Sequence, residues 1–289
     1  MTVLEGIQKS AEFLAKKEVD SPRLQAELLL AHVLKLPRMK LYLNFERALT
    51  DGETDTFREL TKRRAQREPL QHITGSTSFC GFEIAVNRNV LVPRPETEIL
   101  AELGWQFLST IHSELPTALD FGTGSGCIAI ALAAKTPTAK ITALDVSPEA
   151  LEMGKQNAAK NNVEWRIEFV QGNGFEALDS HGQDARATVK FDLIVSNPPY
   201  IPTAEIATLD PEVRDYDPRG ALDGGADGLD FYRWLATQAR PFLKPGGKIM
   251  LEFGDGQGDA IREIFTSQNW IVEAIREDYT QRQRILIAR

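Results

Sequence analysis

The chain is poor in the residues that cross-link small secreted proteins and build metal centres. Its 289 residues include only two cysteines and four histidines. The cysteines, Cys80 and Cys127, cannot form a disulfide framework or a cysteine-rich zinc site, and we expect Cys127 to be a small packing residue. The histidines lack the spacing of metal ligands, so we expect no metal site. They are His32, His72, His112 and His181.

Long apolar runs are also missing. The longest one, from Cys127 to Ala134, has far fewer than the roughly 20 residues that span a bilayer. Glu5 and Lys9 lie where a signal peptide would carry an apolar stretch. We therefore expect a soluble, cytoplasmic protein that makes no contact with membranes.

Basic residues are fewer than acidic ones, and the difference is unevenly distributed along the chain. Lys and Arg number 33 against 41 Asp and Glu, a formal net charge of −8. Residues 1–74 hold 13 basic and 11 acidic residues, whereas the rest of the chain holds 20 and 30. Because proteins that bind nucleic acids usually carry a basic surface, we expect no direct sequence-specific binding of nucleic acid.

The first 74 residues are patterned as helices. Apolar residues recur at helical spacing after a capping Thr2, and Ser21-Pro22 is a cap followed by proline at the first helical position. A third, short helix is expected at residues 38–44 and a fourth at about residues 51–67. Residues 1–74 are thus predicted to form a small helical bundle. Its basic run, Lys62-Arg63-Arg64 with Arg67, has two interpretations: a contact for an acidic partner or RNA, or a solvated helix face.

Beyond residue 74 the pattern changes twice. Residues 75–92 alternate in polarity, which predicts a β-hairpin linker. Residues 93–289 alternate strands with helices, which predicts an α/β, Rossmann-like domain with a mostly parallel sheet. The last strand is expected to be antiparallel, because too few residues precede it for a parallel crossover. Strands are expected at 117–121, 140–145, 167–171, 191–196, 248–253, 271–276 and 282–288, and helices at 126–135, 148–161, 231–242 and 257–267.

A glycine-rich turn joins the first strand of this domain to its first helix. It reads Asp120-Phe121-Gly122-Thr123-Gly124-Ser125-Gly126. Glycines let the backbone approach a ligand closely, and the helix start offers unpaired N–H groups. Asp145, 19 residues beyond Gly126, ends the next strand, where a carboxylate can accept hydrogen bonds from ribose hydroxyls. The pattern favours a nucleotide-containing ligand over a purely structural turn.

Two common nucleotide motifs fit this turn poorly. The dinucleotide pattern G-x-G-x-x-G fails from Gly122 because Cys127 holds its final position, and starting it at Gly124 pushes the turn into the helix. No Gly-Lys-Ser/Thr follows, which excludes a P-loop. The pattern Asp120-x-Gly122-x-Gly124-x-Gly126 instead closely resembles the first motif of class I S-adenosylmethionine-dependent methyltransferases.

That resemblance implies a set of cofactor contacts. The glycine turn would wrap the methionine end of S-adenosyl-L-methionine, and Asp145 would hold its ribose. Asn173 and Gly174 fall where such enzymes contact adenine, although the family commonly has Asp and often an aromatic residue there. Asn173 can still accept the adenine amino hydrogen, and contact at Gly174 would involve backbone or close packing. The implied cofactor residues are Gly122, Thr123, Gly124, Ser125, Gly126, Asp145, Asn173, Gly174 and Asn197.

The most specific motif is Asn197-Pro198-Pro199-Tyr200, directly after the fourth strand. Ligands of open parallel sheets bind beyond the carboxyl ends of the strands, so this motif should meet the glycine turn and Asp145. Two prolines make a stiff turn that presents carbonyl acceptors, Asn197 adds an amide oxygen and Tyr200 adds an aromatic face. A rigid loop with an ordinary core tyrosine is the alternative.

Such acceptors suit one kind of reaction. A planar amide or aromatic amine is a poor nucleophile, because its nitrogen lone pair is delocalised. Acceptors that grip both N–H hydrogens favour pyramidalisation and stabilise the positive charge that develops on the nitrogen. No histidine or cysteine base is needed, since the nitrogen becomes acidic as it is alkylated. The motif indicates methylation of an NH₂ group on a planar system.

Three further stretches resemble bacterial N5-glutamine methyltransferases of class I peptide chain release factors. Residues 68–75 and 92–98 are similar to that family's linker signatures, and residues 217–229 are similar to its loop after the Asn-Pro-Pro-Tyr turn. The resemblance implies methylation of the glutamine in a Gly-Gly-Gln loop, with residues 1–74 recognising the release factor. The implied substrate residues are Asn197 and Pro198 as amide acceptors, Pro199 beside them and Tyr200 shaping the slot.

Several alternatives stay open. A ribosomal-protein glutamine methyltransferase is the close one, and an N6-adenine nucleic-acid methyltransferase is disfavoured by the net charge. A non-catalytic cofactor-binding scaffold is disfavoured by the intact Asn197–Tyr200 motif. Residues 93–96 either line the site or form a rigid linker. The long acidic loop 203–230 is interpreted as a lid on the substrate side.

Overall fold

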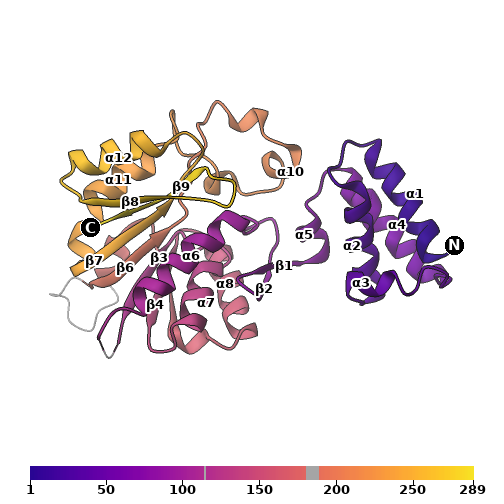
Figure 1. The fold of residues 1–289 in the computed structure, drawn as a ribbon, viewed down its shortest axis with the longest axis horizontal. Helices are drawn as coiled ribbons and strands as arrows, with labels where there is room; N and C mark the ends of the chain where they lie inside the picture. The colour runs from indigo at the N-terminus through magenta and orange to yellow at the C-terminus, as the bar shows by residue number, and fades with distance from the viewer. Residues whose placement is uncertain (114, 180–188) are drawn as a thin grey trace. The chain divides into compact units, whose positions relative to one another are not determined.

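The structure is a computed structural model that describes residues 1–113, 115–179 and 189–289. The chain divides into two compact units (Figure 1). The helical unit comprises Met1–Ser76 and Leu209–Tyr216, and the sheet unit comprises Thr77–Thr208 and Asp217–Arg289. Within the described residues no helix is both long and apolar enough to cross a membrane. His181 lies outside them.

The helical unit begins as the sequence predicts. Thr2 and Glu5 form a capping box at the start of α1, each side chain accepting from the other's backbone N–H. Ser21 precedes α2 with φ +48° and makes no side-chain cap, so that detail of the prediction is wrong. Apolar side chains of α1, α2 and α4 form one core. The elements are α1 (Val3–Ala15), α2 (Pro22–Leu34), α3 (Arg38–Leu41) and α4 (Asp51–Ala65), with two further helices that the sequence does not predict, α5 (Leu70–Thr74) and α10 (Pro211–Arg214).

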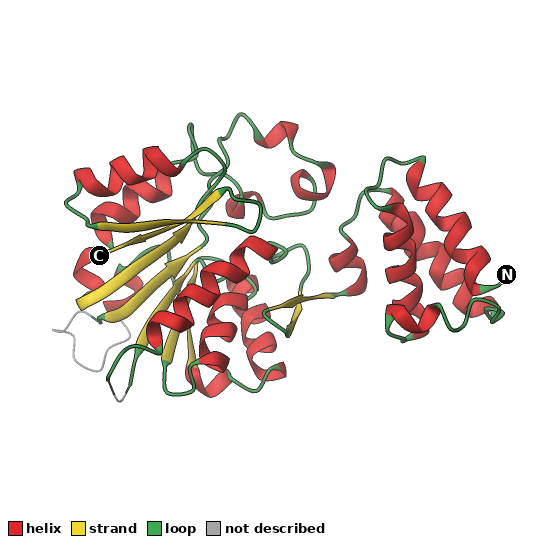
Figure 2. Ribbon diagram, in the orientation of Figure 1, coloured by secondary structure: helices red, strands yellow, loops and turns green. Residues whose placement is uncertain are grey.

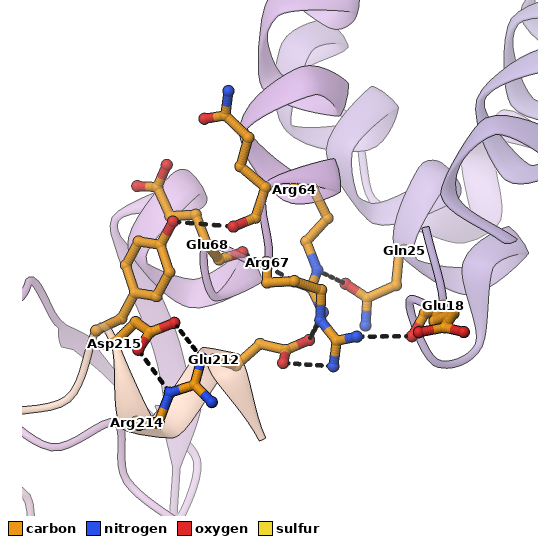
Figure 3. A network of polar contacts seen from close by, with 10 residues as sticks. Glu18, Gln25, Arg64, Arg67, Glu68, Glu212, Arg214 and Asp215 are labelled. Atoms are coloured by element: carbon orange, nitrogen blue, oxygen red, sulfur yellow. Dashed lines mark hydrogen bonds and ion pairs between the residues drawn. The ribbon is translucent and has the colours of Figure 1, made fainter. Parts of the chain in front are cut away.

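A far segment of the chain completes this unit. Glu212 on α10 lies 148 residues from Arg64 in the sequence, yet its Oε1 accepts from Arg64 Nη2 at 2.7 Å. Arg67 Nη2 donates to the other carboxylate oxygen at 2.6 Å (Figure 3). Arg63 pairs with Glu68 at 2.5 Å. These three arginines of the basic run are therefore held within the unit. Both interpretations fail for Arg64, which is 4% exposed.

Glu212 should stabilise α10 against local unfolding. Glu212→Gln leaves the Arg64 guanidinium, whose side chain is 5% exposed, without its carboxylate. Removing one partner of a buried pair costs several kcal/mol, and partial exposure of Glu212 reduces this to about 1–3 kcal/mol. Hydrogen exchange at the backbone amides of α10 and the end of α4 measures the loss. The control Asp215→Asn removes an exposed pair with Arg214 and should change protection little. Equal protection in both variants contradicts the assignment.

The sheet unit contains the predicted, mostly parallel sheet. Its seven strands have the order β5-β4-β3-β6-β7-β9-β8, and only β9 runs antiparallel to its neighbours. The expectation for the last strand is thus confirmed. A separate hairpin of β1 and β2 lies where the sequence predicts one, and it turns at Cys80-Gly81. The strands are β1 (Ser76–Phe79), β2 (Phe82–Ala85), β3 (Thr117–Phe121), β4 (Lys140–Asp145), β5 (Ile167–Gln171), β6 (Phe191–Ser196), β7 (Leu243–Glu252), β8 (Val272–Glu277) and β9 (Gln283–Ala288).

Helices cover both faces of the sheet (Figure 2). Alternate residues of β6 show how: Leu193 and Val195 pack with the helices α6, α7 and α8, whereas Ile194 packs with α11 and α12. A strand buried on both faces reads as a mainly apolar run, and β6, in which Asp192 and Ser196 are the polar residues, is predicted to the residue. The helices are α6 (Pro95–Leu108), α7 (Cys127–Lys135), α8 (Pro148–Lys160), α9 (Glu176–Asp179), α11 (Asp230–Gln238) and α12 (Gly258–Ser267).

Helix α6 is an element that the sequence analysis does not predict. Pro95 occupies its first position and Glu96 and Glu98 lie in its first turn, both typical of a helix start. Its Gly104 lies so close to α7 that a Cβ there would stand 2.9 Å from a Leu132 methyl group. The first turn of α6 also carries Thr97, which becomes important at the site.

Candidate active site

The carboxyl ends of neighbouring parallel strands bring the predicted site residues together. Phe121, the last residue of β3, pairs with Leu144 of β4, and Asp120 pairs with Val195 of β6. The segments that follow these three strands therefore begin at the same level of the sheet. They contain the glycine turn, the end of β4 at Asp145 and the Asn-Pro-Pro-Tyr turn, as the sequence analysis expects.

The glycine turn folds back over the end of β4. Gly122 N and Thr123 N both donate to Leu144 O, at 2.9 and 3.0 Å. Gly124 has φ +54°, and a Cβ there would meet no atom within 4 Å, so the turn leaves open space beside its backbone. At Gly126 a Cβ would lie 3.1 Å from the Gly154 backbone of α8. One glycine thus keeps room for a ligand and the other permits close packing.

Asp120 anchors this turn to the start of α7. Its Oδ2 accepts from Thr123 Oγ1 at 2.6 Å and from Ala129 N at 3.0 Å. The side chain is fully buried, and Oδ1 has no hydrogen-bond partner among the described residues. Burial raises the pKa of Asp120 to about 7, and the nearby Asp145 charge adds to the rise.

This raised pKa makes stability depend on pH. Because the folded value of about 7 exceeds the ordinary 3.8, the contribution of Asp120 to stability is full below the lower value and lost as pH rises through the higher one. Asp120→Asn removes this dependence. Between about pH 5 and about pH 8, the unfolding free energy of the wild type should fall by roughly 1–3 kcal/mol more than that of the variant. Tryptophan fluorescence during urea unfolding measures this in the sheet unit, which holds all four tryptophans. Identical pH dependence in both proteins contradicts the expectation.

Both carboxylate oxygens of Asp145 lie next to the glycine turn and the residues that follow β4. Oδ2 accepts from Gly124 N at 2.8 Å, and Oδ1 accepts from Ser147 N at 2.9 Å. Each oxygen keeps a lone pair for a further donor, such as a ribose hydroxyl. The next residue, Val146, is 60% exposed and offers an apolar surface beside the carboxylate. Val146 belongs to no motif, and only its place directly after Asp145 points to it in the sequence.

The loop after β5 lies next to Asp145. Gly172 N donates to Asp145 O at 3.0 Å. Asn173 is exposed and its side chain is available to a ligand, whereas Gly174 is buried. At Gly174, φ is +147° and a Cβ would stand 2.4 Å from Glu176 Oε2. The backbone at this position therefore favours glycine over the aromatic residue that class I S-adenosylmethionine-dependent methyltransferases often have there.

Ser125, the remaining member of the glycine turn, is buried and fixed from α8. Its carbonyl accepts from Asn157 Nδ2 at 2.9 Å. The same amide group donates to Ala85 O and its oxygen accepts from Ala85 N, so Asn157 ties the turn to the hairpin. Asn157 is not among the predicted site residues, because an asparagine inside a helix belongs to no recognisable motif.

The Asn-Pro-Pro-Tyr turn is held from two sides. Asn197 Nδ2 donates to Thr97 Oγ1 of α6 at 3.1 Å, and Gln257 Nε2 donates to Tyr200 O at 2.9 Å. Pro198 is buried, while Asn197, Pro199 and Tyr200 are half-buried. Burial and the Glu252 charge raise the pKa of Tyr200 to about 12, so the phenol stays protonated at neutral pH.

Glu252 is a site residue that the sequence analysis missed. It ends β7, is 2% exposed and lies beside Asn197, since Ser196 pairs with Leu251. Burial raises its pKa to about 7, and the polar side chains of Thr97 and Asn197 oppose this rise. Its Oε2 has no hydrogen-bond partner among the described residues. Tyr232 Oη donates to its backbone carbonyl at 2.7 Å. An acidic residue at the end of an apolar strand was the available signal.

An ion pair joins residues 92–98 to residues 217–229, two of the stretches that carry the family resemblance. Arg94 Nη2 lies 2.9 Å from Asp217 Oδ2, and the Asp217 side chain is 1% exposed. Burial raises the pKa of Asp217 to about 6 against the lowering effect of Arg94. This pair holds the start of α6 to the middle of the long loop 203–230. Residues 203–230 keep their interpretation as a lid only as a prediction.

Metal and thiol chemistry receive no support from the described part of the chain. Within it, no three His, Cys, Asp or Glu side chains converge in the manner of metal ligands. Cys127 is buried under the glycine turn, and burial raises the pKa of its thiol well above the ordinary value. Its position agrees with a packing role.

Comparison with known proteins gives consistent matches along the chain. Residues 5–75 match the PrmC N-terminal domain, and residues 104–209 match the methyltransferase small domain. A release factor glutamine methyltransferase of Geobacter sulfurreducens is 42% identical over 92% of this chain and 88% of its own. The protein of the same description from Chlorobaculum tepidum is 42% identical over 98% of this chain and 95% of its own. The crystal structure of a methyltransferase from Pyrococcus furiosus superimposes with a TM-score of 0.51 at 24% identity, over 79% of this chain and 98% of that one, and shares the fold.

Proposed function

Because this chain belongs to the release factor glutamine methyltransferase family, we propose that it methylates the side-chain amide nitrogen, N5, of a glutamine in class I peptide chain release factors. The glutamine is that of the Gly-Gly-Gln loop, and the methyl donor is S-adenosyl-L-methionine. The observation that carries the proposal is the placement of Asn197 directly after β6, which lies beside β3 with its glycine turn; β3 in turn lies beside β4, which ends at Asp145. We place the reaction in the cytoplasm.

The residues present fit the proposed methyl donor. Open space beside Gly124 and the two carboxylate oxygens of Asp145 suit a nucleoside with free ribose hydroxyls. Asn173 and the backbone at Gly174 would meet the adenine, and residues 122–126 would hold the methionine end. When bound, S-adenosylmethionine supplies an electrophilic methyl group on its sulfonium.

The Asn-Pro-Pro-Tyr turn prepares the substrate amide. Asn197 Oδ1 and Pro198 O accept its two N–H hydrogens, which favours a pyramidal nitrogen and stabilises the positive charge as the new bond forms. The stiffness of Pro198-Pro199 keeps both acceptors in place. Tyr200 shapes the slot with its ring, and its high pKa rules it out as a base at neutral pH. No base is required, because the alkylated nitrogen loses its proton readily.

A substrate panel with labelled S-adenosylmethionine tests the proposal. The full-length chain is incubated separately with a class I release factor, with ribosomal proteins and with DNA that contains adenine. Label should enter the release factor and disappear when glutamine of Gly-Gly-Gln is replaced by glutamate. Label only in ribosomal protein moves the assignment to a ribosomal-protein glutamine methyltransferase. Label only in DNA overturns the proposal.

A further inference from the structure

The side-chain amide of Asn197 is held from its nitrogen side. Nδ2 donates to Thr97 Oγ1 at 3.1 Å, and the Glu252 carboxylate, whose Oε2 has no hydrogen-bond partner among the described residues, lies close enough to Asn197 to interact with it. Both partners are buried, Thr97 at 3% and Glu252 at 2% exposure. Thr97 and Asn197 both lower the pKa of Glu252, so both side chains interact favourably with its ionised carboxylate. The three side chains, from α6, β7 and the turn after β6, thus form one small polar cluster.

The chemistry of this cluster fixes the orientation of an amide that could otherwise rotate by half a turn. An ionised carboxylate only accepts hydrogen bonds, so Glu252 can meet the nitrogen of Asn197 but not its oxygen. The Thr97 hydroxyl accepts from Asn197 and has its own hydrogen free for Glu252. With the nitrogen engaged on this side, Oδ1 remains the end available to a substrate.

We propose that Thr97 and Glu252 are positioning residues that hold Asn197 with Oδ1 presented to the substrate amide. The inference rests on the proposed function, in which Oδ1 accepts an N–H of the glutamine. A rotated Asn197 would face that N–H with its own N–H groups and repel it. Negative charge on Glu252 also polarises the Asn197 amide and makes Oδ1 a stronger acceptor.

The charge on Glu252 is set by its surroundings. Burial raises its pKa, Glu96 of α6 raises it further, and Arg284 of β9 lowers it, with a result of about 7. The phenols of Tyr200 and Tyr232 also face it and stay neutral at that pH. Glu252 therefore ionises near neutral pH, and the ionised form is the one with which both neighbours interact favourably.

Thr97→Val and Thr97→Ser form a matched pair for testing this arrangement. Valine keeps the buried shape and removes the acceptor for Asn197, whereas serine keeps the hydroxyl. Thr97→Val should lower kcat for release factor methylation about 10- to 100-fold and leave KM within about threefold, and Thr97→Ser should retain most of the activity. Wild-type kcat in Thr97→Val, or equal loss in both variants, overturns the role of Thr97.

Glu252→Gln tests the charge. Glutamine keeps the shape and one acceptor oxygen but does not titrate. Wild-type kcat should rise as pH increases through about 7, and the Glu252→Gln profile should lack this rise. A rise that persists unchanged in the variant overturns the role of Glu252.

A spectroscopic measurement separates this inference from the proposed function. The Asn197 side-chain NH₂ signals, assigned by their loss in Asn197→Ala, report the hydrogen bonds of Nδ2 without any substrate. They should show slow hydrogen exchange in wild type and Thr97→Ser, and fast exchange in Thr97→Val. Equal exchange in all three overturns the inference even where methyl transfer occurs. If the exchange pattern is as expected but no glutamine is methylated, the positioning contact is supported and the proposed function is contradicted.

Discussion

Asn197→Ala should lower kcat for methyl transfer by about 100- to 1,000-fold while leaving the dissociation constant for S-adenosylmethionine within about threefold of wild type. The variant removes an acceptor that acts where positive charge develops, and such preorganised groups are worth this much in other enzymes. The cofactor keeps the glycine turn and Asp145 as its main partners. Single-turnover methylation of a release factor measures the first quantity, and isothermal titration calorimetry measures the second.

Asn89→Ala is the matched control for this experiment. Asn89 is exposed, and among the described residues its side chain makes no hydrogen bond, while its backbone N–H donates to the side chain of Asn87. We expect both constants to be unchanged in the control. A near-wild-type kcat in Asn197→Ala would contradict the acceptor role of Asn197. A large loss of cofactor affinity together with the loss of kcat would assign Asn197 to cofactor binding instead.

Asp145→Ala should weaken S-adenosylmethionine binding by about 100-fold or more, with a smaller loss for Asp145→Asn. The carboxylate has two functions: it accepts from Gly124 N, which fixes the turn, and it offers lone pairs to ribose hydroxyls. Hydrogen bonds to a charged acceptor are worth about 1.5–3 kcal/mol each, so losing two accounts for the effect. Asparagine keeps one acceptor oxygen and should fall between alanine and wild type.

The control for Asp145 is Glu168→Gln on the neighbouring strand β5. It removes one negative charge at an exposed position and should leave the affinity unchanged. The comparison distinguishes the local contacts of Asp145 from the overall negative charge of the chain. Equal affinities in Asp145→Ala and wild type would mean that the ribose is held elsewhere.

Much of the sheet unit could be predicted because its strands are short apolar runs bounded by turn residues. Strands β3 to β6 were predicted to the residue. Helix α6 was missed because Pro93-Arg94-Pro95 suggested a rigid linker, although Pro95 begins the helix. Proline is favourable at the first position of a helix and unfavourable inside one, so the same residue supports both interpretations. The domain boundaries at residues 74 and 92 stay predictions.

Side chains that act through long-range contacts could not be predicted. Thr97 and Glu252 belong to no motif of their own, and only the fold places them beside Asn197. The same holds for Glu212, which neutralises Arg64 and Arg67 from a distant part of the chain. The sequence therefore suggested a free basic surface where the structure has internal ion pairs. A protein partner of the helical unit has to be sought on other surfaces.

The position of the methyl group on the product is the most direct evidence for or against methylation at N5 of the glutamine. After reaction of the wild-type chain with S-adenosylmethionine and a release factor, fragment-ion mass spectrometry of the Gly-Gly-Gln peptide locates the added methyl group. One methyl group is expected on the side-chain nitrogen of that glutamine, and Asn197→Ala should form the same product about 100- to 1,000-fold more slowly. A methyl group on any other residue or atom of the release factor, or an unmodified peptide, would contradict methylation at N5.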